Sequence, residues 1–196
     1  MKLCVFQGTF NPMHNAHLRV AEFVLKKYKF DKIIFIPAFC PPHKDSDPIY
    51  STHRLNIARI STEYNPQFQV SDIEFQRGGK SYTYLTIEEL YKLYDIDGKI
   101  NFIIGTDAFK HIKTWYKTDL LKKRVRFLVF IRENDFNKND YAILKEDGYE
   151  FEFQDLEFAD ISSTQSRQMI KNNETTDGII EKKVREYIDK NELYKN

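Results

Sequence analysis

The feature that most constrains the fold of this chain is the alternation of short apolar runs with longer amphipathic stretches. The runs typical of buried strands cover residues 3–6, 32–36, 101–104 and 126–131, and residues 68–75 alternate like a further strand. The stretches with helical spacing cover residues 18–28, 52–64 and 81–93. Strands that alternate with helices predict βαβ units and a mainly parallel sheet, and therefore an α/β fold. In such folds, ligands bind beyond the carboxyl ends of the strands.

The turn between the first expected strand and the first expected helix carries two histidines, His14 and His17. Residues three apart share a face of a helix, and the first helical turn offers unpaired N–H groups and the positive end of the helix dipole. Phosphate suits such a helix start, and Gly8 lets it approach the backbone closely. Two other interpretations are open for the histidine pair alone: it lines or caps the helix, or it binds zinc. The zinc interpretation lacks matched ligands, such as an H-E-x-x-H or a C-x-x-C pattern.

A second helix start of the same character occupies residues 161–167. Ser162, Ser163 and Thr164 are strong N-cap residues, and they expose hydroxyl and backbone N–H groups where a helix begins. Arg167 lies one turn further on and offers a forked, permanently charged donor that suits phosphate oxygens. Taken alone, the segment is compatible with a phosphate site, and equally with a capped surface helix whose arginine has no ligand-binding role.

Together, the two helix starts resemble the two signatures of the nucleotidylyltransferase superfamily, which transfers nucleotidyl groups from nucleoside triphosphates. Residues 8–17 resemble its G-x-F-[DN]-P-x-H-x-[GA]-H pattern, and residues 161–167 resemble its I-S-S-T-x-x-R pattern. Asn11 stands where many members have Asp, and Ala16 where many have Gly. The resemblance implies that both histidines contact the triphosphate, so we expect the two helix starts to converge on one polyphosphate.

The intervening residues are similar to the bacterial nicotinate-nucleotide adenylyltransferase branch of that superfamily. The shared positions are 41–44 (PPHK), Glu74, Arg77, 81–83 (SYT), 105–107 (GTD), Trp115, Arg132 and the C-terminal stretch 184–194. The resemblance covers nearly the whole chain. It departs at Gln7, which replaces a common Gly, and at residues 84–86, which lack the Asp of an S-Y-T-x-D-T pattern. It implies a Rossmann-like doubly wound sheet in one nucleotidylyltransferase domain, 1–196, with a small C-terminal helical part over about 162–196.

The resemblance implies adenylyl transfer from ATP to nicotinate mononucleotide, giving nicotinate adenine dinucleotide and pyrophosphate in NAD biosynthesis. The catalytic residues it implies are His14, His17, Lys44 and Arg167. The ATP-binding residues it implies are Gly8, Thr9, Phe10, His14, His17, Gly105, Asp107, Ile161, Ser162, Ser163 and Arg167. The mononucleotide-binding residues it implies are His43, Lys44, Tyr82, Thr83, Asp107, Trp115 and Arg132. Mg²⁺ is expected with ATP, held mainly by substrate phosphates and water rather than by protein ligands.

Some of these residues also have plainer interpretations. Trp115, the only tryptophan, is either a core residue or a flat surface on which a pyridine ring stacks. Asp107 is a helix N-cap, a ligand-binding residue or both. His53 and His111 carry no motif, and we expect them to be structural or superficial.

Composition excludes several classes of function. The formal net charge of +1 gives no overall basic field for nucleic acid, and no apolar stretch approaches membrane-spanning length. Cys4 and Cys40 form no close-spaced motif, and no signal-peptide pattern is present, so we expect a cytoplasmic protein. The open alternatives are a sister adenylyltransferase that uses nicotinamide mononucleotide or pantetheine phosphate, and a nucleotide sensor without catalysis. A homo-oligomer is compatible with the sequence but not specified by it.

Three further segments carry structural expectations. Residues 37–51, with four of the six prolines, are expected to form a loop, and the polar residues 133–149 a solvated surface segment with a weak helix over 140–146. Residues 180–194 are expected to form an amphipathic helix that packs on the body. The apolar face of that helix is expected to carry Val184, Tyr187, Ile188 and Leu193.

Overall fold

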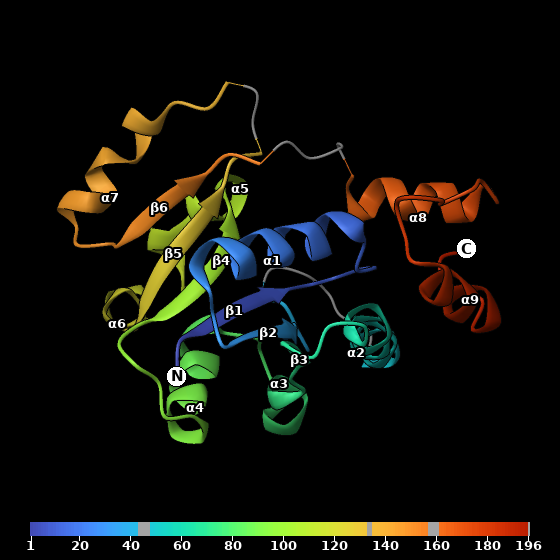
Figure 1. Ribbon diagram of the computed structural model, residues 1–196, viewed down its shortest axis with the longest axis horizontal. Helices are drawn as coiled ribbons and strands as arrows, with labels where there is room; N and C mark the ends of the chain where they lie inside the picture. The colour runs from blue at the N-terminus through green and yellow to red at the C-terminus, as the bar shows by residue number, and fades with distance from the viewer. Residues whose placement is uncertain (43–47, 133–134, 157–160, 196) are drawn as a thin grey trace.

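The computed structural model describes residues 1–42, 48–132, 135–156 and 161–195, and in this part of the chain it contains one parallel sheet with the strand order β3-β2-β1-β4-β5-β6 (Figure 1). The strands are β1 (Leu3–Gly8), β2 (Lys32–Pro37), β3 (Phe68–Val70), β4 (Ile100–Gly105), β5 (Val125–Phe130) and β6 (Phe151–Gln154). Each pair of neighbouring strands is parallel. The α/β, Rossmann-like, mainly parallel fold expected from the sequence is confirmed.

Side chains that alternate along each strand divide between two hydrophobic cores, one on each face of the sheet. On β2, Ile33 and Phe35 point into the first core, whereas Ile34 and Ile36 point into the second. The first core is covered by α1 (Asn15–Tyr28), α2 (Pro48–Thr62), α8 (Ser163–Lys171) and α9 (Lys182–Lys190). The second is covered by α3 (Ile73–Arg77), α4 (Thr83–Leu93), α5 (Thr106–Phe109), η1 (Ile112–Thr114), α6 (Thr118–Arg124), η2 (Lys138–Tyr141) and α7 (Ala142–Glu146). Because both faces are covered, the strands read as continuous apolar runs.

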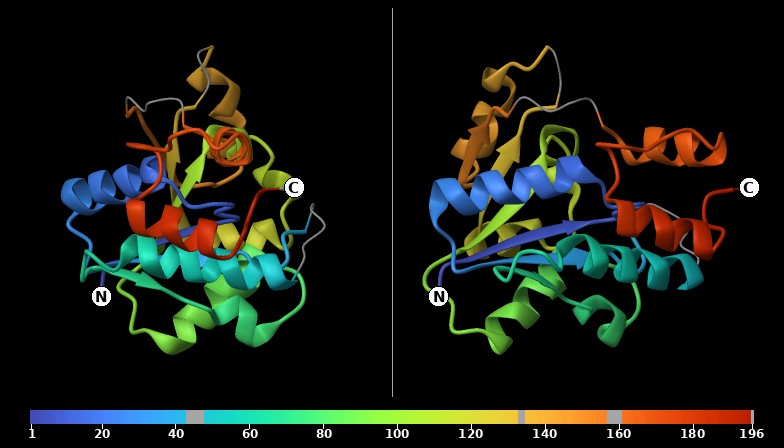
Figure 2. Two further views of the ribbon diagram at one scale, coloured as in Figure 1. Left: turned by 90° about the vertical axis from the view of Figure 1, so that its right-hand side faces the viewer. Right: turned by 45° about the vertical axis from the view of Figure 1, so that its right-hand side comes forward.

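The chain leaves β1 in one direction along the sheet and reaches β4 in the other. The strand order therefore reverses between β1 and β4, and a crevice opens at their carboxyl ends. The C-terminal helices α8 and α9 lie at the end of the molecule toward which β1 points (Figures 1 and 2). This arrangement brings the second predicted helix start to the same edge of the sheet as the first.

The strand expected over 68–75 is wrong in its second half. Only Phe68–Val70 pair with β2, and the short helix α3 begins at Ile73. The backbone turns because the Ser71 hydroxyl accepts a hydrogen bond from the Ile73 N–H, and the Asp72 carbonyl accepts one from the Phe75 N–H. A Ser side chain competes for backbone groups in this way, which helps to end the strand and begin the helix. The expected loop over 37–51 is also too long, because α2 begins at Pro48.

The expectation for residues 133–149 is partly confirmed: the weak helix is present as α7, within the expected 140–146, but the described part of the segment is not wholly solvated. Tyr141, Leu144 and Tyr149 are buried in the second core, where the Tyr141 ring stacks on Phe109 with centroids 5.9 Å apart. The strand β6 that follows was not expected from the sequence. In this region the few apolar residues lie among many charged ones, so the sequence shows no clear helical or strand period. Strand β6 forms because it pairs with the edge strand β5.

The expected C-terminal helix is confirmed as the shorter α9, with Val184 and Ile188 buried against the first core. The Tyr187 hydroxyl bonds with His53 Nδ1 at 2.9 Å and accepts from Asn56 Nδ2 at 3.1 Å, which joins α9 to α2. His53 is therefore structural, as expected. None of the described helices combines the length and the apolar character needed to span a bilayer.

The buried position of Leu144 can be tested against its exposed neighbour. We expect Leu144→Ala to lower the free energy of unfolding by about 2–5 kcal/mol, because it leaves a cavity in the second core. Ile143→Ala, at a side chain that is 52% exposed, should change it by less than about 0.5 kcal/mol. Urea unfolding of the two variants gives both values. Equal effects would contradict the burial of this segment.

Candidate active site

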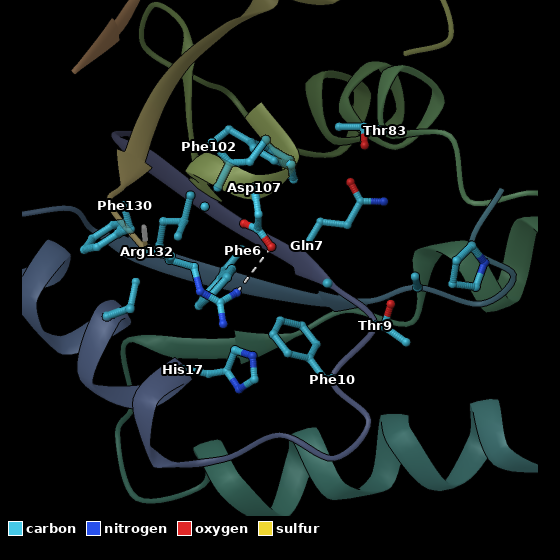
Figure 3. A pocket seen from close by; sticks show the side chains of 18 of the residues that line it. Phe6, Gln7, Thr9, Phe10, His17, Thr83, Phe102, Asp107, Phe130 and Arg132 are labelled. Atoms are coloured by element: carbon cyan, nitrogen blue, oxygen red, sulfur yellow. Dashed lines mark ion pairs between the residues drawn. The ribbon is translucent and has the colours of Figure 1, made fainter. Parts of the chain in front are cut away.

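A cavity of about 1390 Å³ lies at the carboxyl ends of β1, β4 and β5, where the strand order reverses (Figure 3). It exceeds the roughly 300–1,000 Å³ of a typical small-molecule pocket, and so has room for two ligands side by side. The residues expected at the site that line it are Gly8, Thr9, Phe10, His14, His17, Tyr82, Thr83, Gly105, Asp107, Trp115, Arg132, Ile161 and Ser162. Ser163 and Arg167 lie beside it, and His43 and Lys44 fall outside the described residues.

The start of α1 holds the two histidines in direct contact. His14 is the N-cap residue, and the centroids of the His14 and His17 rings are 3.8 Å apart. The backbone N–H of His14 donates to Nδ1 of His17 at 3.2 Å. Because Nδ1 of His17 must accept this bond, the neutral ring carries its proton on Nε2. His17 therefore presents an N–H donor on the opposite edge of its ring.

Both imidazoles are neutral near pH 7 in the free protein. Burial, and then the positive charge of Arg132, lower the pKa of His14 to about 4. Burial also lowers the pKa of His17 well below its usual value, and His14 and Arg132 act in the same direction. Nδ1 of His14 is buried without a hydrogen-bond partner among the described residues. The pair thus offers polar atoms to a ligand without a fixed charge of its own.

The loop between β1 and α1 brings Phe10 over the end of the strand. Its ring stands edge-on to His17 with centroids 5.0 Å apart (Figure 3), and a Cβ atom on Gly8 would lie 3.1 Å from the Phe10 ring. Glycine at position 8 therefore permits the close approach of this ring. Phe10 has a φ of 47°, a left-handed conformation that few non-glycine residues adopt.

The second helix start contacts this loop directly. The Ser163 hydroxyl donates to the Pro12 carbonyl at 3.0 Å, and Nη1 of Arg167 donates to the Asn11 carbonyl at 2.7 Å. Ser162 caps α8, because its Oγ accepts from the Gln165 N–H at 3.1 Å. The two motifs, about 150 residues apart, thus converge on one loop. Arg167 reaches that loop rather than the cavity lining.

Across the cavity, the ends of β4 and β5 place a carboxylate beside a guanidinium. Asp107 Oδ2 lies 3.6 Å from Nη1 of Arg132 (dashed in Figure 3), and the Arg132 N–H donates to the hydroxyl of buried Thr106 at 3.2 Å. A Cβ on Gly105 would lie 2.9 Å from the Arg132 side chain and closer still to Asp107. Glycine at position 105 therefore lets both charged groups cover the end of the strand.

Aromatic side chains form the wall of the cavity farthest from α1. Trp115 is half-buried and stands edge-on to Phe102, with centroids 6.3 Å apart, while another part of it lines the cavity. The Tyr82 and Tyr116 rings lie 4.6 Å apart, and the Lys117 ammonium sits 5.3 Å from the Tyr116 ring. Trp115 thus belongs both to the core and to the cavity lining, and the stacking of a pyridine ring on it stays a prediction.

A buried carboxylate supports the floor of the cavity, and sequence reasoning gave it no role. Glu74 is 1% exposed and accepts hydrogen bonds from Gln7 Nε2, the Thr86 hydroxyl and the Phe39 N–H, at 2.6, 2.6 and 3.2 Å. Arg77 lies 3.7 Å away and partly balances its charge. Glu74 and Arg77 are therefore scaffold residues, and no local pattern could have paired them with Gln7.

Two further residues were underestimated by sequence reasoning. His111, expected to be superficial or structural, is exposed and lines the cavity. Its place four residues after Asp107, just beyond the end of β4, was the available signal. Arg54, which carries no motif, is buried and donates to the Thr9 carbonyl at 2.7 Å.

Comparison with known proteins agrees with this geometry. Residues 5–169 match the cytidylyltransferase-like family. The chain is 37% identical to the probable nicotinate-nucleotide adenylyltransferase of Fusobacterium nucleatum, over 97% of this chain and 98% of that protein. It is 36% identical to the nicotinate-nucleotide adenylyltransferase of Bacillus subtilis, over 100% and 99% of the two chains.

A solved structure shows the same fold. The nicotinic acid mononucleotide adenylyltransferase of Plasmodium falciparum, complexed with NaAD, superposes with a TM-score of 0.80 at 19% identity, over 98% of this chain and 97% of that one. With full-length relatives above one-third identity and a family match over most of its residues, the chain belongs to the cytidylyltransferase-like family and, within it, to the nicotinate-nucleotide adenylyltransferases.

Proposed function

We propose that this protein transfers the adenylyl group of ATP to nicotinate mononucleotide, producing nicotinate adenine dinucleotide and pyrophosphate. One observation carries the proposal: a single cavity joins the histidine pair of α1 to the aromatic wall around Trp115. Its full-length relatives carry the name of the same activity. The cavity has room for a nucleoside triphosphate at one end and a pyridine mononucleotide at the other.

The reaction requires alignment rather than a covalent nucleophile. A phosphate oxygen of the mononucleotide forms a bond to the α-phosphorus of ATP, and the bond from that phosphorus to the bridging oxygen of pyrophosphate breaks. Both reactants are anions, so the protein must bring them together in line and stabilise charge on the transferring phosphate. Alignment alone can offset about 7–11 kcal/mol of such a barrier.

His17 and His14 are the residues we place against the triphosphate. The Nε2–H of His17 would donate to an α-phosphate oxygen, and the unpartnered Nδ1 of His14 leaves that ring without a competing bond on that atom. The α8 start, with Ser162 and Ser163, adds donors at the same end. Arg167 already donates to the Asn11 carbonyl and to Thr164, which leaves others of its five N–H groups for the β- or γ-phosphate. The role of Lys44 stays a prediction from the resemblance.

The opposite end of the cavity suits the mononucleotide. Trp115 offers a flat surface for the pyridine ring, with Tyr82 and Thr83 beside it. Arg132 is the cation that we assign to the mononucleotide phosphate, and Asp107 is assigned to a ribose hydroxyl. How the site separates a carboxylate from an amide stays open, as do a cytoplasmic location and a homo-oligomer.

Mg²⁺ would enter as part of the ATP complex. The described residues contain no cluster of three or more His, Cys, Asp or Glu side chains suited to hold a metal ion. That Mg²⁺ is held mainly by phosphate oxygens and water, the coordination it prefers, stays a prediction. When bound, the ion neutralises phosphate charge; the residues of the chain align the two substrates.

A direct comparison of acceptors tests the proposed reaction. With ATP and Mg²⁺, we expect pyrophosphate release with nicotinate mononucleotide, and a lower kcat/KM with nicotinamide mononucleotide. Pantetheine phosphate serves as the control, and it should give no release above background. Tight ATP binding by calorimetry, without release on any of the three acceptors, would favour a nucleotide sensor instead.

The role of the Nε2–H of His17 can be isolated by substitution. We expect His17→Ala to lower kcat by about 10²–10³-fold, because it removes a donor to the transition state. Its thermal midpoint should stay close to that of the wild type. His53→Ala, which removes an imidazole bonded to α9 outside the cavity, is the control and should retain turnover. Near-normal turnover of His17→Ala would contradict the assignment.

Substitution of Trp115 tests the mononucleotide end of the cavity. We expect Trp115→Ala to raise KM for nicotinate mononucleotide more than KM for ATP, because the stacking surface is lost. Trp115→Phe keeps an aromatic face and should lie closer to the wild type. Steady-state kinetics with each substrate varied in turn provide the measurement, and equal changes in the two KM values would argue against stacking.

A further inference from the structure

We propose that Tyr194 and Arg54 are positioning residues that hold the two flanks of Phe10, and through Phe10 fix the position of the His17 imidazole. Neither residue lines the cavity in the described part of the chain. The inference rests on the proposed function, because it assigns a role in the use of ATP at the same site. The inference depends on hydrogen bonds that reach the loop between β1 and α1 from Arg54 in α2 and from Tyr194 near the C-terminal end of the chain.

The loop contains a conformation that its own sequence does not favour. Phe10 is buried at a φ of 47°, where non-glycine side chains are strained. Such conformations persist only where the surroundings fix them, and they are common at functional sites. The neighbours on both sides, Thr9 and Asn11, must therefore be held.

Tyr194 holds the Asn11 side. Its hydroxyl donates to Asn11 Oδ1 at 2.7 Å, while Arg167 donates to the carbonyl of the same residue at 2.7 Å. The Tyr194 side chain is 7% exposed, and its ring lies near Tyr50 with centroids 6.0 Å apart. Burial raises the pKa of Tyr194, so its hydroxyl stays protonated and remains a donor throughout the neutral range. A residue near the end of the chain thus fixes the side chain of a residue in the first motif.

Arg54 holds the Thr9 side. It is 3% exposed, and its Nη1 donates to the Thr9 carbonyl at 2.7 Å. Nη2 donates to the Ser51 hydroxyl at 2.9 Å and to the Phe39 carbonyl at 3.3 Å. These hydrogen-bond partners are all neutral, and the Glu74 carboxylate acts on this guanidinium only through its charge. A buried positive charge therefore lies directly behind the loop that we assign to the triphosphate.

Phe10 transmits these contacts to the histidines. Its ring stands at 85° to His17 with centroids 5.0 Å apart, and it also packs edge-on to Phe6 at 5.4 Å. A shift of Thr9 or Asn11 would move this ring and with it the His17 donor. Because misplacement of a catalytic group by about 1 Å can cost ~10²-fold in rate, we expect the loss to appear in the use of ATP before it appears in the fold.

The test compares two tyrosine-to-phenylalanine variants in the same C-terminal region. Tyr194→Phe removes the bond to Asn11, whereas Tyr187→Phe removes the bonds to His53 and Asn56, which lie away from the loop. We expect both variants to lower the thermal midpoint by a similar amount, roughly 2–4 °C. Only Tyr194→Phe should lower kcat/KM for ATP, by about tenfold, a difference of ~1.4 kcal/mol, with KM for nicotinate mononucleotide unchanged. Equal kinetics in the two variants would overturn the proposal for Tyr194.

A double-mutant cycle connects the effect to the bond itself. Asn11→Ala and Tyr194→Phe remove the two ends of one hydrogen bond, so the double variant should lose little more than the more damaged single variant. Multiplicative losses in kcat/KM for ATP would show that the two residues act independently and would overturn the inference.

Arg54→Lys keeps the charge but not the forked donor, and it should also lower kcat/KM for ATP; unchanged kinetics would remove Arg54 from the proposal.

Calorimetry with a non-hydrolysable ATP analogue separates this proposal from the proposed function. If the wild type binds the analogue but releases no pyrophosphate with nicotinate mononucleotide, the proposed function fails. In that case, weaker analogue binding by Tyr194→Phe, and not by Tyr187→Phe, still supports the role of Tyr194 in shaping the loop. If the wild type is active and Tyr194→Phe equals it in both turnover and analogue binding, only the positioning role fails.

Discussion

The site depends on the hydrogen bonds that side chains of α8 donate to the loop between β1 and α1. Arg167 and Ser163 reach the carbonyls of Asn11 and Pro12, groups that no strand or helix pairs. Buried backbone carbonyls need partners, so these contacts stabilise the loop and at the same time set the place of α8. Without these bonds, the start of α8 would not be held beside the start of α1. The cavity would then lose the end that Ile161 and Ser162 line.

The pKa values of the histidine pair are lowered first by burial, and the positive charge of Arg132 acts in the same direction. Both imidazoles have lowered pKa values, and the backbone bond from His14 to Nδ1 of His17 selects the tautomer of the second ring. A neutral N–H donor in a fixed position suits a phosphate oxygen, because it needs no reorganisation when charge develops there. Among the described residues, the positive charges near this pair include Arg132, at the end of β5, and Arg54, behind the loop.

The floor of the cavity contains a buried charge that is stabilised by hydrogen bonds. Glu74 is a buried carboxylate, and it is tolerated because Gln7, Thr86 and Phe39 all donate to it while Arg77 lies nearby. This cluster joins the end of β1 to α3 and α4 beneath the cavity. Gln7 departs from the glycine common in the family, and here its amide is part of that connection.

The sequence by itself determined the parallel α/β fold and both helix starts, because apolar periodicity and capping residues are local properties that each segment carries alone. It did not determine the burial of Tyr141 and Tyr149, the strand β6, or the division of residues 68–75 between strand and helix, since those depended on the edge of β5 and on hydrogen bonds accepted by the Ser71 side chain and the Asp72 backbone. Only the tertiary structure decided that Arg54, Glu74 and Tyr194 support the site. The bonds that tie them to distant segments, to Thr9, Phe39 and Asn11, span 45, 35 and 183 residues, and a hydrogen bond between distant segments leaves no period or spacing in the sequence.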